Sequence, residues 1–174
     1  MNRVYGIGLP RTGTASLAEA LKKLGHTTRH FCMLHDTEEF QYDNNDVSIL
    51  IDNSFYTKCK KMVEEIFHQY KNSLFILTTR NVTDWDKSIS KFHSIPEDLP
   101  DIFQYEKLVK SIFRSIRKED NLLVINIFED SRSIEKLCNF IGVEYQDVPF
   151  PHIKKEHEIN LDSILERRVV LTDI

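Results

Sequence analysis

The chain has 174 residues, of which 41% are hydrophobic and 29% are charged, and this balance excludes disordered, collagen-like and mucin-like proteins. Its 23 basic and 27 acidic residues give a net charge of −4, which argues against a general nucleic-acid or anionic-membrane binder but leaves room for a small anionic ligand. The three cysteines are widely spaced, and no apolar run has the length of a membrane span or the form of a signal peptide, so we expect a soluble cytoplasmic protein.

The apolar residues change their period several times along the chain, and each change marks a predicted element. Short apolar or β-branched runs predict strands at residues 3–7, 47–51, 74–79 and 122–127. Apolar residues spaced three and four apart predict helices at residues 15–24, 55–70, 83–92, 108–116 and 134–141. Gly25 and Gly142 stand where the first and last of these helices should end, and Thr83 with Asp86 is typical of a helix start.

Strands that alternate with helices predict an α/β fold, in which helices cover both faces of a mainly parallel central sheet. We expect one domain over residues 1–174, with its core at about residues 3–150 and a tail at 151–174. Ligands of such sheets bind beyond the carboxyl ends of the strands. The least regular stretches, residues 26–46 and 93–105, are expected to shape the pocket. The candidate site therefore lies at the turns that follow Ile7, Ile51, Thr79 and Ile127.

The first of these turns, from Gly8 to Gly13, joins a strand directly to a helix. Backbone N–H groups and the positive end of the helix dipole converge at such a turn and form a cradle for an anion. The glycine spacing matches a Walker A loop, but Thr14 and Ala15 occupy the positions of its phosphate-binding Lys and its Mg²⁺-binding hydroxyl. Arg11 inside the turn supplies the cation instead, which disfavours an ATPase or a kinase. A purely structural strand–turn–helix is the other interpretation of the glycines.

The segment Leu-Pro-Arg-Thr-Gly-Thr-Ala-Ser-Leu at residues 9–17 resembles the 5′-phosphosulfate loop of sulfotransferases that use 3′-phosphoadenosine 5′-phosphosulfate (PAPS). A branch with Arg in a "PRTGTTSL" loop is the more similar one, and Ala15 replaces the second Thr of that loop. The resemblance implies a three-layer P-loop NTPase-like fold. It also implies a 5′-phosphosulfate site that consists of Arg11, Thr12, Gly13, Thr14, Ala15 and Ser16.

A second motif follows the strand at residues 74–79. Arg80 comes directly after this strand and Ser88 lies on the next helix, an arrangement similar to the 3′-phosphate site of the same family. Arg offers a planar fork of donors to a phosphate and Ser adds a neutral donor, whereas ATP and GTP carry no 3′-phosphate. Trp85 between them resembles the family's "RDPEKW" stretch. Taken alone, Arg80 and Ser88 would indicate only a surface charge and a solvated hydroxyl.

A third resemblance lies near the end of the chain. Residues 120–142 and the Pro-Phe-Pro-His segment at residues 149–152 resemble the closing strand, helix and "FPH" segment of the family. Lys154 departs from the pattern, because the family usually has Asn two residues after the His. The whole resemblance spans about residues 3–155.

Sulfuryl transfer needs in-line positioning, a cation near the leaving phosphate and a base for the acceptor, and it can proceed without a metal. We predict that Arg11 is the catalytic cation and that Asp52, at the end of the second strand, is the base. Asp52 could equally cap the following helix or be a Walker-B-like acid of a kinase, and His30 and His35 are rival bases. His30, Cys32 and His35 lack a fourth ligand of standard zinc spacing, so no metal site is expected.

These observations together predict a PAPS-dependent sulfotransferase that needs no metal and acts on a hydroxyl or amine of a small molecule, a peptide or a glycan. No nucleic-acid partner is expected, and the acceptor and the oligomeric state stay open. One alternative is a small-molecule or nucleotide kinase on the same fold, against which Thr14 and Ala15 count. The other is a nucleotide-binding interaction protein without turnover, an interpretation that Ala15 and Lys154 keep open.

Overall fold

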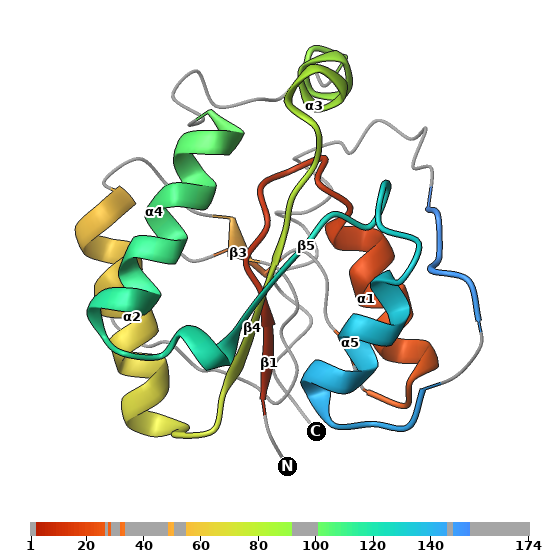
Figure 1. The fold of residues 1–174 in the computed structure, drawn as a ribbon. Helices are drawn as coiled ribbons and strands as arrows, with labels where there is room; N and C mark the ends of the chain where they lie inside the picture. The colour runs from red at the N-terminus through yellow and green to blue at the C-terminus, as the bar shows by residue number, and fades with distance from the viewer. Residues whose placement is uncertain are drawn as a thin grey trace, which may run out of the picture.

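The computed structural model describes residues 3–26, 28, 32–33, 49–50, 55–91, 101–145 and 148–153. Within them the chain forms short strands that alternate with helices (Figure 1). The strands are β1 (Val4–Gly6), β2 (Cys32–Met33), β3 (Ile49–Leu50), β4 (Leu74–Thr78) and β5 (Leu122–Ile125). The helices are α1 (Thr14–Lys23), α2 (Phe55–Gln69), α3 (Val82–Ile89), α4 (Ile102–Ser115) and α5 (Ser133–Ile141), and a short 3-10 helix, η1 (Glu119–Asn121), precedes β5.

The central sheet of the described chain has three parallel strands in the order β1-β4-β5. Tyr5 pairs with Phe75 and Leu123 pairs with Ile76, so β4 lies in the middle. β3, which belongs to the strand predicted at residues 47–51, pairs in parallel with β2 in a separate two-stranded sheet. The predicted α/β fold with a parallel sheet and flanking helices is confirmed.

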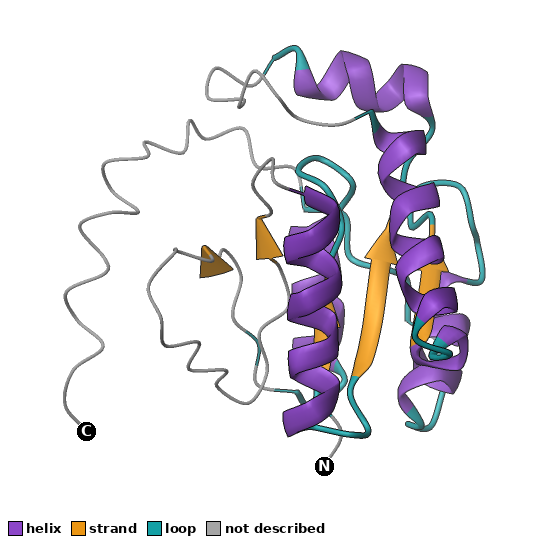
Figure 2. Cartoon of the chain, turned by 90° about the vertical axis from the view of Figure 1, so that its left-hand side faces the viewer, coloured by secondary structure: helices purple, strands orange, loops and turns teal. Residues whose placement is uncertain are grey.

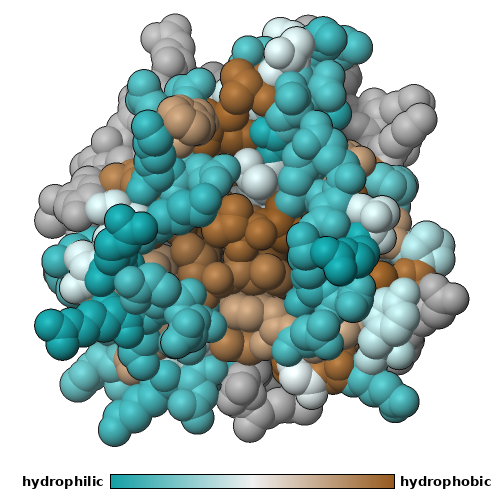
Figure 3. All heavy atoms as spheres, in the orientation of Figure 1, coloured by the Kyte–Doolittle hydropathy of each residue, from teal (hydrophilic) through white to brown (hydrophobic). Residues whose placement is uncertain are grey.

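Helices cover both faces of this sheet. In Figure 1, α2 and α4 lie on one side of the strands, and α1 and α5 lie on the other. Successive residues of β4 point to opposite faces, because Phe75 and Leu77 belong to one core cluster and Ile76 belongs to the other. All three side chains are fully buried, as expected for the middle strand of a sheet that is covered on both sides. On the face seen in Figure 3, hydrophobic residues gather along the middle between hydrophilic flanks.

Two predicted helix ends are confirmed and one predicted helix start is wrong. Gly142 directly follows α5 and Gly25 follows Leu24, the C-cap of α1, and both glycines adopt left-handed backbone conformations. Thr83 is not the N-cap of α3, since Asn81 precedes the helix and its Oδ1 accepts a hydrogen bond from the Thr83 N–H at 3.0 Å. The Thr83 amide is therefore one of the donors that the cap satisfies.

Helix α4 begins earlier than predicted. The Oδ1 of Asp101 accepts hydrogen bonds from the N–H groups of Phe103 and Gln104, at 2.9 and 3.1 Å, and so caps the helix at Ile102. Buried Ile102 and Tyr105 extend its apolar face. The expected irregular stretch at residues 93–105 is thus helical from Ile102, and its earlier part, like most of residues 26–46, lies outside the described residues.

The carboxyl ends of β1, β4 and β5 meet at one edge of the sheet, and α3 lies across this edge (Figures 1 and 2). The turns that follow these three strands therefore come together there, which is the arrangement expected of a ligand site in a parallel sheet.

Candidate functional site

The turn from Ile7 to Gly13 carries β1 into the N-terminus of α1. Arg11 and Gly13 both have left-handed backbone conformations, with φ of 68° and 97°. The first turn of α1 contains no acidic residue, and the Leu17 N–H donates to the Gly13 carbonyl at 2.9 Å. The amides in the first turn of an α-helix have no carbonyl partner within the helix, and the helix dipole places partial positive charge at that end. The turn therefore has the backbone arrangement of an anion site.

Gly8 allows the turn to pass close to the end of β4. A Cβ atom on Gly8 would lie 1.9 Å from the Thr78 Oγ1, so any larger residue would push the turn away from the strand. The Thr12 hydroxyl donates to the Leu9 carbonyl at 2.7 Å and lies 2.7 Å from the Thr78 hydroxyl, and the Thr12 N–H also donates to Leu9. Both donors of Thr12 are thus engaged within the protein, and its contact with a cofactor stays a prediction.

Three side chains from the second motif contact this turn. The Arg11 Nε donates to the Ser88 Oγ at 3.0 Å, and the Arg80 Nη1 donates to the Arg11 carbonyl at 3.2 Å. The indole of Trp85 is buried and donates to the Pro10 carbonyl at 2.8 Å. The two motifs, which are far apart in the sequence, therefore form one continuous site.

The guanidinium of Arg80 also lies over the ring of Phe128, with its Cζ 4.3 Å from the ring centroid. Its Nε is buried and has no hydrogen-bond partner among the described residues. A buried donor without a partner is costly, and the charge of an arginine favours an acidic oxygen in that place. Arg80 therefore has an unused donor suited to an anionic ligand.

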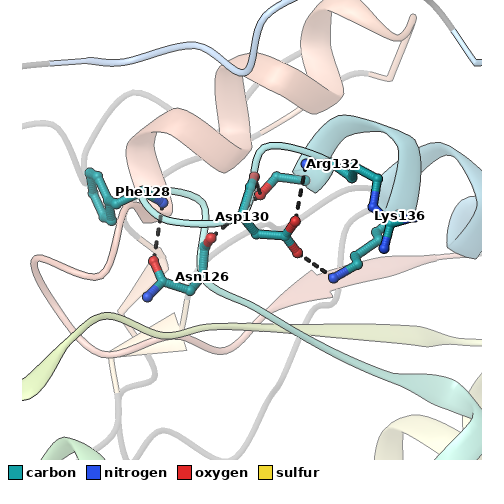
Figure 4. A network of polar contacts seen from close by, with 6 residues as sticks. Asn126, Phe128, Asp130, Arg132 and Lys136 are labelled. Atoms are coloured by element: carbon teal, nitrogen blue, oxygen red, sulfur yellow. Dashed lines mark hydrogen bonds and ion pairs between the residues drawn. The ribbon is translucent and has the colours of Figure 1, made fainter.

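Hydrogen bonds within the turn after β5 hold Phe128 in place (Figure 4). The Oδ1 of Asn126 accepts a hydrogen bond from the Phe128 N–H at 3.1 Å. The Asp130 carboxylate accepts from the Lys136 ammonium and, at 3.0 Å, from the Arg132 N–H. The hydrogen bond from Lys136 is the main reason that the pKa of Asp130 lies below its usual value; the Arg132 N–H acts in the same direction, and burial opposes both.

The structure adds three contributors that the sequence did not indicate. The Tyr105 hydroxyl donates to the Ile7 carbonyl at 2.6 Å, but Tyr105 falls in a stretch expected to be irregular. Phe128 lies so close to the turn that a Cβ on Gly13 would be 3.2 Å from its ring, and its place just after a strand end is the signal that could have found it. The Ile153 N–H donates to the Ser16 Oγ at 3.1 Å, across a sequence separation that gives no signal.

The residues predicted for the two phosphate sites all lie at the carboxyl edge of the sheet. They are Arg11, Thr12, Gly13, Thr14, Ala15, Ser16, Arg80 and Ser88. The predicted base Asp52 and its rivals His30 and His35 lie outside the described residues, and so does the side chain of Cys32.

In the described part of the chain, no three His, Cys, Asp or Glu side chains are close enough together to hold a metal ion. None of the helices in these same residues is long and apolar enough to cross a membrane.

No curated protein matches the chain. A family model described as a sulfotransferase domain matches residues 3–101, which is more than half of the chain and contains both the glycine-rich turn and the Arg80–Ser88 motif. The chain therefore belongs to the sulfotransferase domain family.

Proposed function

We propose that the protein transfers a sulfuryl group from PAPS to a hydroxyl or amine of an acceptor. Family membership supports sulfuryl transfer in general. The choice of PAPS as the sulfuryl donor rests on the 3.0 Å hydrogen bond from Arg11 to Ser88. This bond joins the turn proposed for the 5′-phosphosulfate to the motif proposed for the 3′-phosphate. A nucleotide with anionic groups at both positions suits such a paired basic site.

The donor set fits PAPS. The amides of the first turn of α1, with the hydroxyl of Thr14, would hold the 5′-phosphosulfate. Arg80, with its buried unused Nε, and Ser88 would hold the 3′-phosphate. The Ser88 hydroxyl accepts from Arg11, so its own proton can be donated to a phosphate oxygen. PAPS, when bound, supplies the activated sulfuryl group.

Arg11 is proposed to stabilise the negative charge that grows on the departing phosphate. Its guanidinium is held by Ser88 before any ligand binds, and a pre-positioned cation needs no reorganisation as the charge develops. The first turn of α1 contains no acidic residue, so no side chain there offsets the partial positive charge at the N-terminus of the helix.

The base that accepts the acceptor's proton is proposed to be Asp52, with His30 and His35 as the alternatives. A carboxylate or imidazole at this position would serve as a general base. Turnover measured after replacement of each of the three side chains decides between them. A screen of candidate acceptors with labelled PAPS identifies the acceptor.

The proposal is tested first by the choice of nucleotide. We expect adenosine 3′,5′-bisphosphate in EDTA to raise the Tm more than ATP with Mg²⁺ does, because binding to the native state alone stabilises it by mass action. The glycine turn has Thr14 and Ala15 where a kinase needs its Lys and metal-binding hydroxyl, which is the reason for the expected order. A larger shift with ATP and Mg²⁺ would favour the kinase alternative. Bisphosphate binding without turnover of labelled PAPS on any acceptor would favour the interaction protein.

The Arg80→Ala variant tests the assignment of the two phosphates. It should weaken adenosine 3′,5′-bisphosphate by about ten- to a hundredfold, the value of a hydrogen bond to a charged group, and leave adenosine 5′-monophosphate nearly unchanged. Arg114→Ala is the matched control, because Arg114 is exposed and lies at the C-terminal end of α4. Equal weakening of both nucleotides by Arg80→Ala would show that Arg80 does not bind the 3′-phosphate.

A further inference from the structure

Residues 149–153, here named the strap, contact both the turn after β5 and helix α1. Phe150 is buried and belongs to the same core cluster as Leu17 of α1. The His152 ring lies 6.1 Å from the ring of Phe128, and the Ile153 N–H donates to the Ser16 Oγ at 3.1 Å. The strap is drawn in blue at the right of Figure 1. It is thus anchored in the core and attached to two of the segments that form the site.

The bond to Ser16 reaches the part of α1 that matters for anion binding. Ser16 is the third residue of α1 and is buried. It lies in the first turn, where amides without intrahelical partners leave a helix most prone to fray. A hydrogen bond from a core-anchored segment restrains this turn. Because the Ser16 hydroxyl accepts the strap's N–H, its own O–H remains as a donor.

We propose that the strap is a positioning element of the nucleotide site, in which the Ile153 N–H holds Ser16 and the first turn of α1 in the arrangement that binds the 5′-phosphate. The proposal rests on the proposed function, because it assumes that this turn binds the nucleotide. A turn that is already ordered loses less conformational freedom on binding. The coupling is reciprocal. If a docked strap raises the affinity for the nucleotide by some factor, then bound nucleotide raises the equilibrium constant for strap docking by the same factor.

The test removes the donor and leaves the rest of the strap. Ile153→Pro deletes the N–H, whereas Ile153→Ala retains it and measures the contribution of the exposed side chain alone. Each change is made in the wild type and in Ser16→Ala, and titration calorimetry measures the binding of adenosine 3′,5′-bisphosphate and adenosine 5′-monophosphate. Proline also restricts the backbone of the residue before it. In the Ser16→Ala background the hydrogen bond is already absent, so any effect of proline that remains there comes from this backbone restriction.

We expect Ile153→Pro to weaken both nucleotides by the same factor, about two- to tenfold, because they share the 5′-phosphate. Ile153→Ala should have a smaller effect, and Ile153→Pro should add nothing in the Ser16→Ala background. The Tm of each unliganded variant checks the fold, and Ser16→Ala alone, which should weaken both nucleotides equally, serves as the test if the proline variant does not fold.

Several results would overturn the proposal. They are an equal effect of Pro and Ala at residue 153, a proline effect that persists in Ser16→Ala, and a loss confined to the bisphosphate. Each would mean that the strap does not act through Ser16 on the 5′-phosphate. If the wild type binds neither nucleotide, the proposed function fails and the strap proposal fails with it. If the wild type binds and the variants bind equally well, only the strap proposal fails.

Discussion

Arg11 has a backbone conformation that glycine adopts without steric cost and other residues rarely adopt. Its φ of 68° lies in the left-handed region, and its Nε and carbonyl oxygen both bond to side chains of the second motif. A left-handed residue other than Gly, Asn or Asp costs about 1–2 kcal/mol, and such residues cluster at functional sites. The strain at Arg11 is therefore the cost of placing a guanidinium inside the turn.

Two substitutions separate this strain from the function of the guanidinium. Arg11→Ala and Arg11→Gly both remove the bond to Ser88, but only Gly relieves the strain. We expect Arg11→Gly to be more stable than Arg11→Ala by about 1 kcal/mol in chemical denaturation, while both weaken the bisphosphate equally. Equal stability of the two variants would show that the turn does not impose the left-handed conformation.

At this scale the sequence placed Arg11, Arg80 and Ser88 in motifs predicted to bind two separate phosphates, and it did not predict that these residues contact one another. Their contacts depend on how α3 docks against the turn, and no local pattern encodes that. The bond between Ser16 and Ile153 was out of reach for the same reason, since it spans 137 positions.

Among the elements, the turn from Asn126 to Asp130 illustrates how hydrogen bonds to a charged side chain stabilise a short loop. The pKa of Asp130 is lowered chiefly by the hydrogen bond from Lys136, so the native state favours the ionised carboxylate. The stabilisation is then present above the usual pKa of 3.8 and is lost as the pH falls through the lower native pKa. Because the pair with Lys136 is partly exposed, it should contribute less than about 1 kcal/mol.

Asp130→Asn should therefore lower the free energy of unfolding slightly at pH 7, and the difference from the wild type should shrink below pH 3.8. Urea unfolding at a series of pH values measures this difference. A gap that stays constant from pH 7 to pH 3 would mean that the carboxylate's charge does not stabilise the turn.

The elements themselves were predicted where the apolar pattern is strong. β4 and the ends of α1 and α5 agree with prediction because a run of apolar and β-branched residues and a glycine after a helix are local signals. The N-cap of α3 was misplaced by two residues, since Thr83 and Asn81 are both good caps and the pattern does not choose between them. α4 was recognised late because the preceding proline-containing stretch concealed the cap at Asp101.

In the whole molecule, the sheet brings four distant segments to one edge. Because β1, β4 and β5 are parallel, the glycine turn, the start of α3 and the turn after β5 lie side by side. The strap, which follows α5 in the chain, contacts the same edge through Ser16. The opposite edge carries Ser73, whose carbonyl accepts from the Asn121 side chain at 2.9 Å, and none of the predicted phosphate-binding residues, all of which the structure describes. Ligand binding should therefore affect the two edges differently.

Hydrogen exchange with and without adenosine 3′,5′-bisphosphate measures this difference. At a ligand concentration of about 100 Kd, amides of β4 that exchange only by global unfolding should slow about a hundredfold, because the ligand stabilises the whole native state. Amides of residues 7–16, 80–88, 126–130 and 149–153 should slow as well, since the ligand opposes their local opening. We expect amides at the opposite edge, in residues 70–73 and 117–121, to exchange by local fraying that leaves the ligand bound, so their rates should not change. Slowing at that edge equal to the slowing at the turns, or unchanged rates in residues 80–88, would contradict a nucleotide site built from the carboxyl ends of β1, β4 and β5.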